Sequence, residues 1–285
     1  MLQKRIEELR NGLHEALYLD LDEFGLEAEG NDLFSKFIGL AVGSAFQPVF
    51  RAGNRAQPLG FEALLRPAIG PDPVNPEFAF GFADTQGKLV KLDRVARTLH
   101  TLNYLALPQD RGLLFLNVHP RLVVSVNAHG KVFERVLHQH SVPTHQVVIE
   151  VLESVIDIDR QLAEAIGNYH DRGYKIAIDN FGRKHTNLDR LWKVSAEFIK
   201  LDAGIIREAA VNPKARRILP GLIKIIAETG AEDVVQGIET REQLQIALDA
   251  GARNLQGYYL GRPQPGAAWH ARPAAWPDQA GSAGD

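Results

Sequence analysis

Short apolar segments alternate with longer amphipathic ones along most of this chain. From Ala45 onward, apolar runs rich in Val, Ile and Phe are separated by stretches in which apolar residues recur at helical spacing. The first pattern is typical of buried β-strands, and the second of α-helices that pack on one face. We expect strands at residues 46–51, 59–66, 113–118, 147–152, 175–181, 198–202, 233–238 and 254–260. Helices are expected at residues 89–107, 121–140, 160–172, 215–228 and 241–250.

The order of these elements predicts the fold class. Repeated alternation of strand and helix is typical of a parallel sheet, and about eight strands in roughly 240 residues fit a closed barrel better than an open sheet. No Gly-x-Gly-x-x-Gly motif follows any expected strand, which argues against a dinucleotide-binding domain. We therefore expect an α/β protein with a β/α barrel over residues 37–266.

Both ends of the chain lie outside the expected barrel. Apolar residues recur at helical spacing in residues 2–17, which predicts an amphipathic helix, and an acidic linker with glycines follows it up to residue 36. The helix either packs on its own domain or forms a dimer, and the spacing leaves both open. Residues 67–76 are rich in proline and are expected to form an irregular loop, and residues 267–285 a flexible tail.

Composition removes several classes of function. The 285 residues include no cysteine, so disulfides and thiolate metal sites are excluded, and any metal must be bound by carboxylate, amide or imidazole groups. The net charge of -3 provides no general attraction to nucleic acid, and no apolar run is long enough to span a membrane. We expect a cytoplasmic protein with neither nucleic acid nor membrane as a partner.

Polar residues follow most of the expected strands. In residues 174–182, the apolar run Ile176, Ala177 and Ile178 leads directly to Asp179 and Asn180. Taken alone, this segment is also typical of a strand-to-helix turn, in which Asp or Asn caps the next helix. The same feature recurs, however, at Glu62, Asn117, Glu150, Lys200 with Asp202, Gln236 with Glu239, and Gln256.

The carboxyl ends of barrel strands meet at one mouth, where active sites of this architecture lie. We therefore expect these side chains to converge. Three carboxylates and one amide would form an all-oxygen pocket suited to Mg²⁺, Mn²⁺ or Ca²⁺, from Glu62, Asn117, Glu150 and Asp179. Such a cluster repels itself unless a cation binds or some carboxyl groups are protonated. A structural pairing of Glu150 with Lys175 or Arg172 is an alternative for that residue alone.

A series of short motifs occurs along the chain in a fixed order. Phe46-Gln47-Pro48 is followed by E-A-L-L-R at residues 62–66, L-N-V-H-P at 116–120 and E-V-L-E at 150–153. D-N-F-G at 179–182, K-L-D at 200–202, Q-G-I-E-T at 236–240 and Q-G-Y at 256–258 come next, with Pro263 and Pro265 after them. Their order and spacing resemble those of the EAL family, bacterial phosphodiesterases that hydrolyse the second messenger cyclic di-GMP.

The resemblance implies a modified (β/α)8 barrel, similar to a TIM barrel, with one antiparallel strand. It also implies a site for Mg²⁺ or Mn²⁺, with Ca²⁺ as an inhibitor, formed by Glu62, Asn117, Glu150 and Asp179. At the positions of the family's catalytic centre stand Lys200, Asn180 and Gln236. At positions that bind the nucleotide stand Arg66, Leu64, Glu239, Gln256 and Pro263.

Two positions depart from the family pattern where the chemistry would take place. The family's second aspartate, which helps to hold a second metal, is Asn180 here, and the first glutamate of its E-G-V-E-T motif, which helps to hold the attacking water, is Gln236. An amide supplies an oxygen but neither a negative charge nor a proton acceptor near neutral pH. Residues 183–187 also differ from the family's T-G-Y-S-S, and His119 replaces a serine. We therefore expect one metal ion rather than two.

Two functions from different classes are compatible with these residues. The first is a degenerate EAL domain that has lost most hydrolytic activity and acts by binding cyclic di-GMP or a protein partner. The alternative is an active, metal-dependent cyclic di-GMP phosphodiesterase that releases linear pGpG, in which Asp202 or Glu239 compensates. Loss of a metal ligand together with a water ligand favours the first. A homodimer is a further expectation, and the sequence names no protein partner.

Overall fold

The computed structural model describes residues 25–108, 110–125, 129–153, 159–183 and 188–277. Eight strands of its single sheet close into a barrel. They are β3 (Leu40–Arg51), β4 (Asn54–Ile69), β6 (Leu113–Asn117), β7 (Val147–Leu152), β8 (Lys175–Phe181), β9 (Phe198–Leu201), β10 (Glu232–Val235) and β11 (Asn254–Leu255).

One strand of the barrel runs against the others. β3 pairs in antiparallel fashion with both β4 and β11, and this double pairing closes the sheet, whereas the six remaining junctions are parallel. The expected barrel with one antiparallel strand is therefore confirmed.

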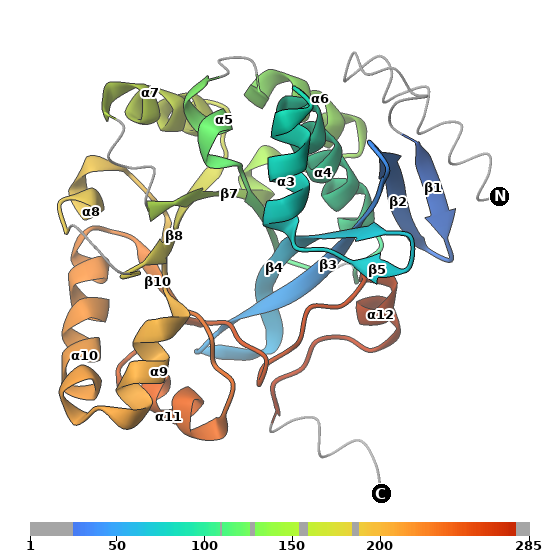
Figure 1. The fold of residues 1–285 in the computed structure, drawn as a ribbon. Coiled ribbons are helices and arrows are strands. Elements are labelled where there is room, and N and C mark those ends of the chain that lie inside the picture. The colour runs from blue at the N-terminus through green and yellow to red at the C-terminus, as the bar shows by residue number, and fades with distance from the viewer. Residues whose placement is uncertain (1–24, 109, 126–128, 154–158, 184–187, 278–285) are drawn as a thin grey trace, which may run out of the picture.

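Helices surround this barrel (Figure 1). They are α3 (Pro76–Thr85), α4 (Leu89–Tyr104), α5 (Pro120–Ser125), α6 (His129–Gln139), α7 (Asp159–His170), α8 (Arg190–Lys193), α9 (Ala203–Val211), α10 (Pro213–Glu228), α11 (Arg241–Asp249) and α12 (Gly266–Ala271), with a short 3-10 turn at Thr144–Gln146.

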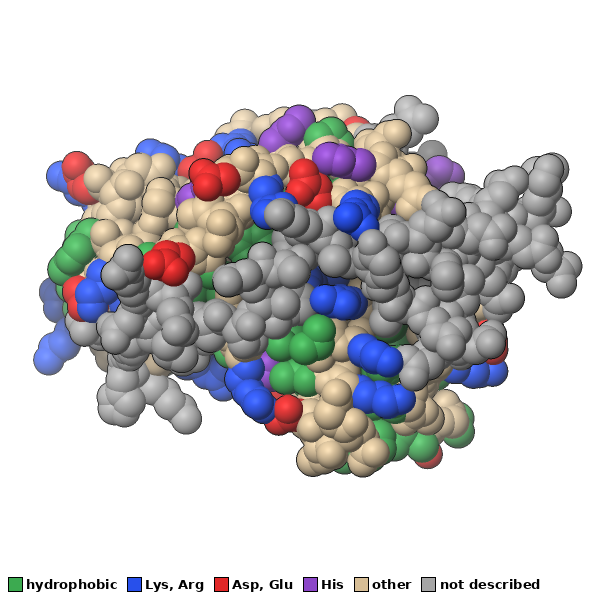
Figure 2. Space-filling model, turned by 90° about the horizontal axis from the view of Figure 1, so that it is seen from above, with side chains coloured by type: hydrophobic (Ala, Val, Ile, Leu, Met, Phe, Trp, Pro, Cys, Tyr) green, Lys and Arg blue, Asp and Glu red, His purple; other side chains and the backbone are tan. Residues whose placement is uncertain are grey.

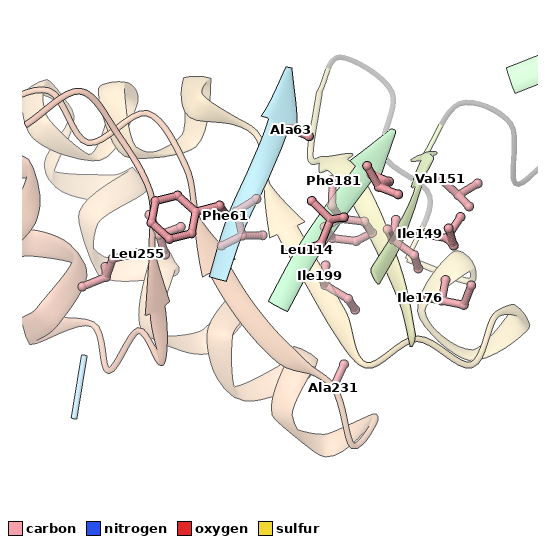
Figure 3. Packing of buried hydrophobic residues seen from close by; sticks show 14 of the residues in the cluster. Phe61, Ala63, Leu114, Ile149, Val151, Ile176, Phe181, Ile199, Ala231 and Leu255 are labelled. Carbon is pink, nitrogen blue, oxygen red and sulfur yellow. The ribbon is translucent and has the colours of Figure 1, made fainter. Parts of the chain in front are cut away.

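Alternation along the strands divides the core into two parts. Residues that face outward pack beneath the helices, among them Leu114, Ile149, Ile176 and Ile199 (Figure 3). Residues at the alternate positions form a separate apolar layer inside the barrel, with Val49, Phe115, Val148, Ala177, Phe198 and Val234 as its members. Because side chains alternate with a period of two, the next inward position on five of these strands holds Asn117, Glu150, Asp179, Lys200 or Gln236. The strand register thus places a polar layer directly above an apolar one.

The prediction of an acidic linker up to residue 36 is wrong for its last residues, which form two strands. Residues Leu26–Glu29 and Asp32–Phe37 form an antiparallel hairpin, β1 and β2, and β2 adds to the edge of β3. Leu26 and Phe37 are buried, and the buried Asn103 side chain on α4 bonds both the N–H and the carbonyl of Leu33. Paired backbone and buried apolar residues therefore stabilise this segment. The predicted N-terminal helix lies outside the described residues.

The expected loop at residues 67–76 also has regular structure at its start. β4 continues to Ile69 and turns back into β5 (Asp72–Pro73), so this part is a short hairpin, and α3 begins at Pro76. Proline at the first helical position is favourable there, because that position needs no N–H donor.

The prediction of a flexible tail from residue 267 is wrong for residues 267–277, which pack against the barrel. Trp269 on α12 is buried and donates its indole N–H to the carbonyl of Phe46 at 2.7 Å. Trp276 is only 1% exposed and packs edge-on against Phe50, with ring centroids 5.8 Å apart. Two large aromatic side chains therefore hold the C-terminal segment against the base of β3.

The surface carries charges of both signs. Figure 2 shows Lys and Arg side chains next to Asp and Glu, with a small hydrophobic group among the basic ones. In the part of the chain that the structure describes, no helix is both long and apolar enough to cross a membrane.

Candidate functional site

Lys200 lies at the centre of the polar layer. Its Nζ atom contacts Glu150 Oε1 at 2.5 Å, Glu62 Oε2 at 2.8 Å and Asp179 Oδ1 at 3.6 Å. The Lys200 side chain is 0% exposed, and each of the three carboxylates is less than a tenth exposed. One buried ammonium group therefore serves three carboxylates from β4, β7 and β8.

Amide side chains complete this layer. Glu62 accepts hydrogen bonds from Asn117 Nδ2 at 3.0 Å and from Gln256 Nε2 at 2.7 Å. Gln236 donates to Gln256 Oε1 at 3.4 Å, and Asn180 donates to Asp179 Oδ2 at 2.8 Å. Asn180 and Gln236 are thus hydrogen-bonded to their neighbours.

The three carboxyl groups differ in their affinity for protons. Burial alone would raise the pKa of Glu62, but the Lys200 charge and its hydrogen bonds outweigh this effect and lower that pKa to about 2. Burial raises the pKa of Glu150 well above its ordinary value, and the charge of Glu62 adds to the rise. Burial also raises the pKa of Asp179, whereas the surrounding carboxylates raise the pKa of Lys200 in spite of its burial. Glu62 is therefore the one of the three carboxyl groups whose pKa is lowered.

A pocket of about 340 Å³ opens above the polar layer. Seven of the residues predicted from the sequence line it, namely Glu62, Leu64, Asp179, Asn180, Gln236, Glu239 and Gln256. Glu150 and Lys200 lie buried beneath these residues. The lining of this pocket does not include Arg66, Asn117 or Pro263. Burial lowers the pKa of Arg66, and Tyr258 and Glu62 oppose this shift.

The sequence alone did not single out several residues of the pocket wall, namely Gln47, Ala203, Gly237, Gly257 and Tyr258. Gln47 and Tyr258 belong to the recognised F-Q-P and Q-G-Y motifs, which was the available signal. Gly257 is required because a Cβ atom there would lie 2.1 Å from the carbonyl oxygen of Ile238. Tyr258 is 48% exposed, and the Arg262 guanidinium lies 4.7 Å from its ring centroid.

The backbone at the end of β8 has an unusual conformation. Asn180 has a φ of 57°, in the left-handed region that Asn tolerates better than most residues, and Gly182 has a φ of 94°. Glu153 accepts a hydrogen bond from Gly182 N at 3.2 Å and pairs with Arg190 at 3.0 Å. This pairing braces the start of the following loop, whose residues 184–187 lie outside the described part of the chain.

The predicted metal ligands meet at this site, but they are turned towards Lys200. Among the described residues, no group of three or more His, Cys, Asp or Glu side chains is arranged to hold a metal ion as it stands. Two buried carboxylate oxygens, Glu150 Oε2 and Asp179 Oδ1, have no hydrogen-bond donor among the described residues. Asp179 Oδ1 lies 3.6 Å from Lys200 Nζ, beyond hydrogen-bond distance, and carboxylate oxygens are the ligands that hard divalent cations prefer. The donor set therefore fits such a cation by its chemistry.

A barrel with an acidic pocket at the carboxyl ends of its strands is the setting of many hydrolytic enzymes. The chain matches the family model of the EAL domain over residues 39–263, and it therefore belongs to the EAL family.

Known proteins similar to this chain carry names from cyclic di-GMP metabolism. It is 26% identical over 231 residues to the probable cyclic di-GMP phosphodiesterase PdeN of Escherichia coli. The aligned residues cover 78% of this chain and 43% of PdeN. The solved cyclic di-GMP complex of the PaMucR phosphodiesterase is 24% identical, with a TM-score of 0.68 over 79% of this chain and 92% of that one. The calcium and cyclic di-GMP complex of BlrP1 from Klebsiella pneumoniae is also 24% identical, with a TM-score of 0.71 over 84% of this chain and 58% of that one.

The comparisons support a shared fold, and they cover only part of the curated relatives. At such identities the two solved structures show that the fold is shared. The chain spans less than half the length of the first curated relatives it matches.

Proposed function

We propose that this chain is a cytoplasmic EAL domain that binds cyclic di-GMP and hydrolyses it only weakly. The observation that carries the proposal is the pairing of two amides in the pocket wall, Asn180 with Asp179 and Gln236 with Gln256. Both amides stand where the resemblance implies carboxylates, while Gln47, Glu62, Leu64, Asp179, Glu239 and Gln256 agree with the family's motifs.

Weak hydrolysis follows from the chemistry of the amide group. Two-metal hydrolysis needs negative charge to hold the second cation and a group that positions or deprotonates the attacking water. Asn180 and Gln236 are neutral and bind no proton near neutral pH. Loss of both functions costs orders of magnitude in rate, because each acts in the same chemical step.

One divalent cation, Mg²⁺ or Mn²⁺, remains part of the proposal. Glu62, Asn117, Glu150 and Asp179 would hold it, and Ca²⁺ would occupy the same site without supporting hydrolysis. When bound, the cation neutralises negative charge on a phosphate group of the ligand. The residues of the chain itself position the nucleotide, and for this role we propose Arg66, Leu64, Glu239, Gln256 and Pro263.

The alternative, an active phosphodiesterase, needs a carboxylate that compensates for the lost ones. Asp202 is the nearest in sequence to Lys200, but its Oδ1 atom accepts the N–H of Gly204 at 2.8 Å and caps α9. That hydrogen bond satisfies the N-terminus of the helix and opposes movement of Asp202 into the pocket. Glu239 lies exposed at the rim. Neither residue makes the active enzyme the better proposal.

We also propose that the chain forms a homodimer through exposed apolar residues of α9 and α10. Val211, Ile218 and Ile225 are exposed to 79%, 66% and 46%, and they are spaced seven residues apart on α9 and α10. Ile218 and Ile225 share one face of α10, because residues seven apart in one helix do so, and such a face packs against its own copy in many helical dimers, whereas Val211 lies on the separate helix α9. Sedimentation of the natural chain and of Ile218→Glu tests this dimer. We expect the natural chain to sediment as a dimer and Ile218→Glu as a monomer, and a monomeric natural chain would contradict the proposal.

Calorimetric titration with cyclic di-GMP tests the proposed function. We expect the natural chain to bind cyclic di-GMP both in Mg²⁺ and in Ca²⁺, and to bind little or no GMP, the control ligand. The Gln256→Ala variant should bind cyclic di-GMP more weakly, because it lacks a pocket side chain that bonds Glu62. Absence of any heat or saturation with cyclic di-GMP would reject the proposal.

A further inference from the structure

The acidic cluster already contains a cation that belongs to the chain. The Lys200 ammonium group lies within 3.6 Å of Glu62, Glu150 and Asp179, which are three of the four proposed metal ligands. Its side chain is fully buried, and its Nζ atom lies 6.0 Å from the centroid of the Phe115 ring. The group therefore cannot turn towards solvent without rearrangement of the packed layer below it.

We propose that Lys200 is an internal counterion that competes with a divalent cation for these carboxylates, and so sets how weakly the domain binds metal. This inference rests on the metal site of the proposed function. It assigns to Lys200 a role in cation affinity, separate from any role in the chemical step.

Charge at short range supports competition. A Mg²⁺ or Ca²⁺ ion binds carboxylate oxygens at about 2.0–2.6 Å. Glu62 and Glu150 each use one oxygen to bind Lys200, so a cation shared by the same groups would lie close to the ammonium. Two positive charges repel each other strongly at such separations, because the buried site is shielded little by water. The cation must therefore take the carboxylates from Lys200 or bind weakly beside it.

The substitutions at positions 180 and 236 limit the negative charge available. With Asn180 and Gln236, the described pocket holds Glu62 and Asp179, with Glu150 beneath them and Glu239 at its rim. Lys200 offsets one of these charges already. Removal of the Lys200 charge leaves the buried carboxylates without a neighbouring positive charge. A divalent cation can then provide that positive charge.

The experiment compares the natural chain of 285 residues with Lys200→Gln. Manganese binding is measured by calorimetry, and thermal unfolding is followed in EDTA and in rising MnCl₂. We expect Lys200→Gln to unfold at a lower temperature than the natural chain in EDTA, to bind Mn²⁺ at least tenfold more tightly, and to show a larger thermal shift with Mn²⁺. Lys36→Gln is the matched control, because it removes the same charge from an exposed pair with Glu27; its Mn²⁺ affinity should equal that of the natural chain.

The outcomes separate this inference from the proposed function. If Lys200→Gln binds Mn²⁺ no more tightly than the natural chain, competition is wrong, even where cyclic di-GMP still binds. If neither protein binds Mn²⁺, the metal site itself is wrong and the inference falls with it. Should Lys200→Gln fail to fold in EDTA, Lys200→Met is refolded from denaturant with and without Mn²⁺. Recovery only with Mn²⁺ supports competition, and failure in both conditions rejects it.

Discussion

Restoring the two carboxylates should restore hydrolysis of cyclic di-GMP. The change is Asn180→Asp together with Gln236→Glu, which returns one negative charge beside Asp179 and one beside Gln256. Each single reversion should gain less than the pair, because residues that serve one chemical step are not additive. The expected gain for the pair is at least about 100-fold in turnover, the size of effect that one well-placed electrostatic group has.

The structure gives a magnitude for the cost of this change. Asn180 Nδ2 and Asp179 Oδ2 are 2.8 Å apart, so Asn180→Asp replaces a hydrogen bond by two facing carboxylates. Even at a separation of about 4 Å, like charges repel by about 4 kcal/mol at an effective dielectric constant near 20. A divalent cation between them removes this repulsion, and at 100 times its Kd it adds about 2.7 kcal/mol to the free energy of unfolding. The double variant should therefore be less stable than the natural chain in EDTA and regain stability in Mn²⁺.

Formation of linear pGpG is measured by chromatography with Mg²⁺ or Mn²⁺ for the natural chain, both single variants and the double variant. Glu62→Ala in the double variant is the control, since it removes a proposed metal ligand and should abolish the gain. The reasoning is wrong if the double variant gains no turnover while it folds, binds cyclic di-GMP and is stabilised by Mn²⁺. It is equally wrong if the natural chain turns over rapidly and Glu62→Ala abolishes that activity.

Two further predictions concern stability. Trp276→Ala should lower the free energy of unfolding in urea by about 3–5 kcal/mol, because it empties a buried site against Phe50, whereas Trp192→Ala, at a side chain 72% exposed, should change it by less than about 0.5 kcal/mol; equal effects would refute the packed C-terminal segment. Burial, aided by the charge of Arg66, lowers the pKa of His100 from 6.5 to about 3, so its contribution to stability is complete above pH 6.5 and is lost as the pH falls, by about 1.4 kcal/mol per unit. The natural chain should show this extra slope between pH 6 and 4 relative to His100→Asn but not relative to the exposed His138→Asn, and parallel curves for all three proteins would contradict it.

The sequence predicted the barrel because its signal is local and repeated. Apolar runs such as residues 147–152 and 175–181 coincide with β7 and β8. Residues 233–238 were expected to form one strand, but β10 ends at Val235, because Gly237 takes a φ of 74° that ends the extended conformation. Alternation also carries no information on strand direction, so the reversal of one strand was expected from the family resemblance alone, and the structure shows that this strand is β3.

The elements that the sequence missed depend on distant contacts. The hairpin of β1 and β2 consists of two short strands, and Asn103 on α4, far away in the sequence, bonds its backbone. The C-terminal segment is held by Trp269 and Trp276, two aromatic residues in a stretch of otherwise loop-like composition. Neither contact is visible in local periodicity.

The composition of the pocket was largely predictable, and its connections were not. Strand ends identified the polar residues, and six of them line one pocket. Which groups pair depends on side-chain geometry across the barrel: Glu150 bonds Lys200 rather than the Lys175 or Arg172 considered as alternatives. The roles of these residues in binding and hydrolysis remain predictions for the experiments above.

The fate of the bound nucleotide distinguishes a domain that binds cyclic di-GMP from one that hydrolyses it. The natural chain, in excess over cyclic di-GMP and with Mg²⁺ present, is incubated for the time in which the Asn180→Asp, Gln236→Glu variant converts its ligand, and the nucleotide is then released and chromatographed. We expect the natural chain to retain intact cyclic di-GMP through a gel-filtration step. Complete conversion to linear pGpG by the natural chain, at the rate of the double variant, would contradict it.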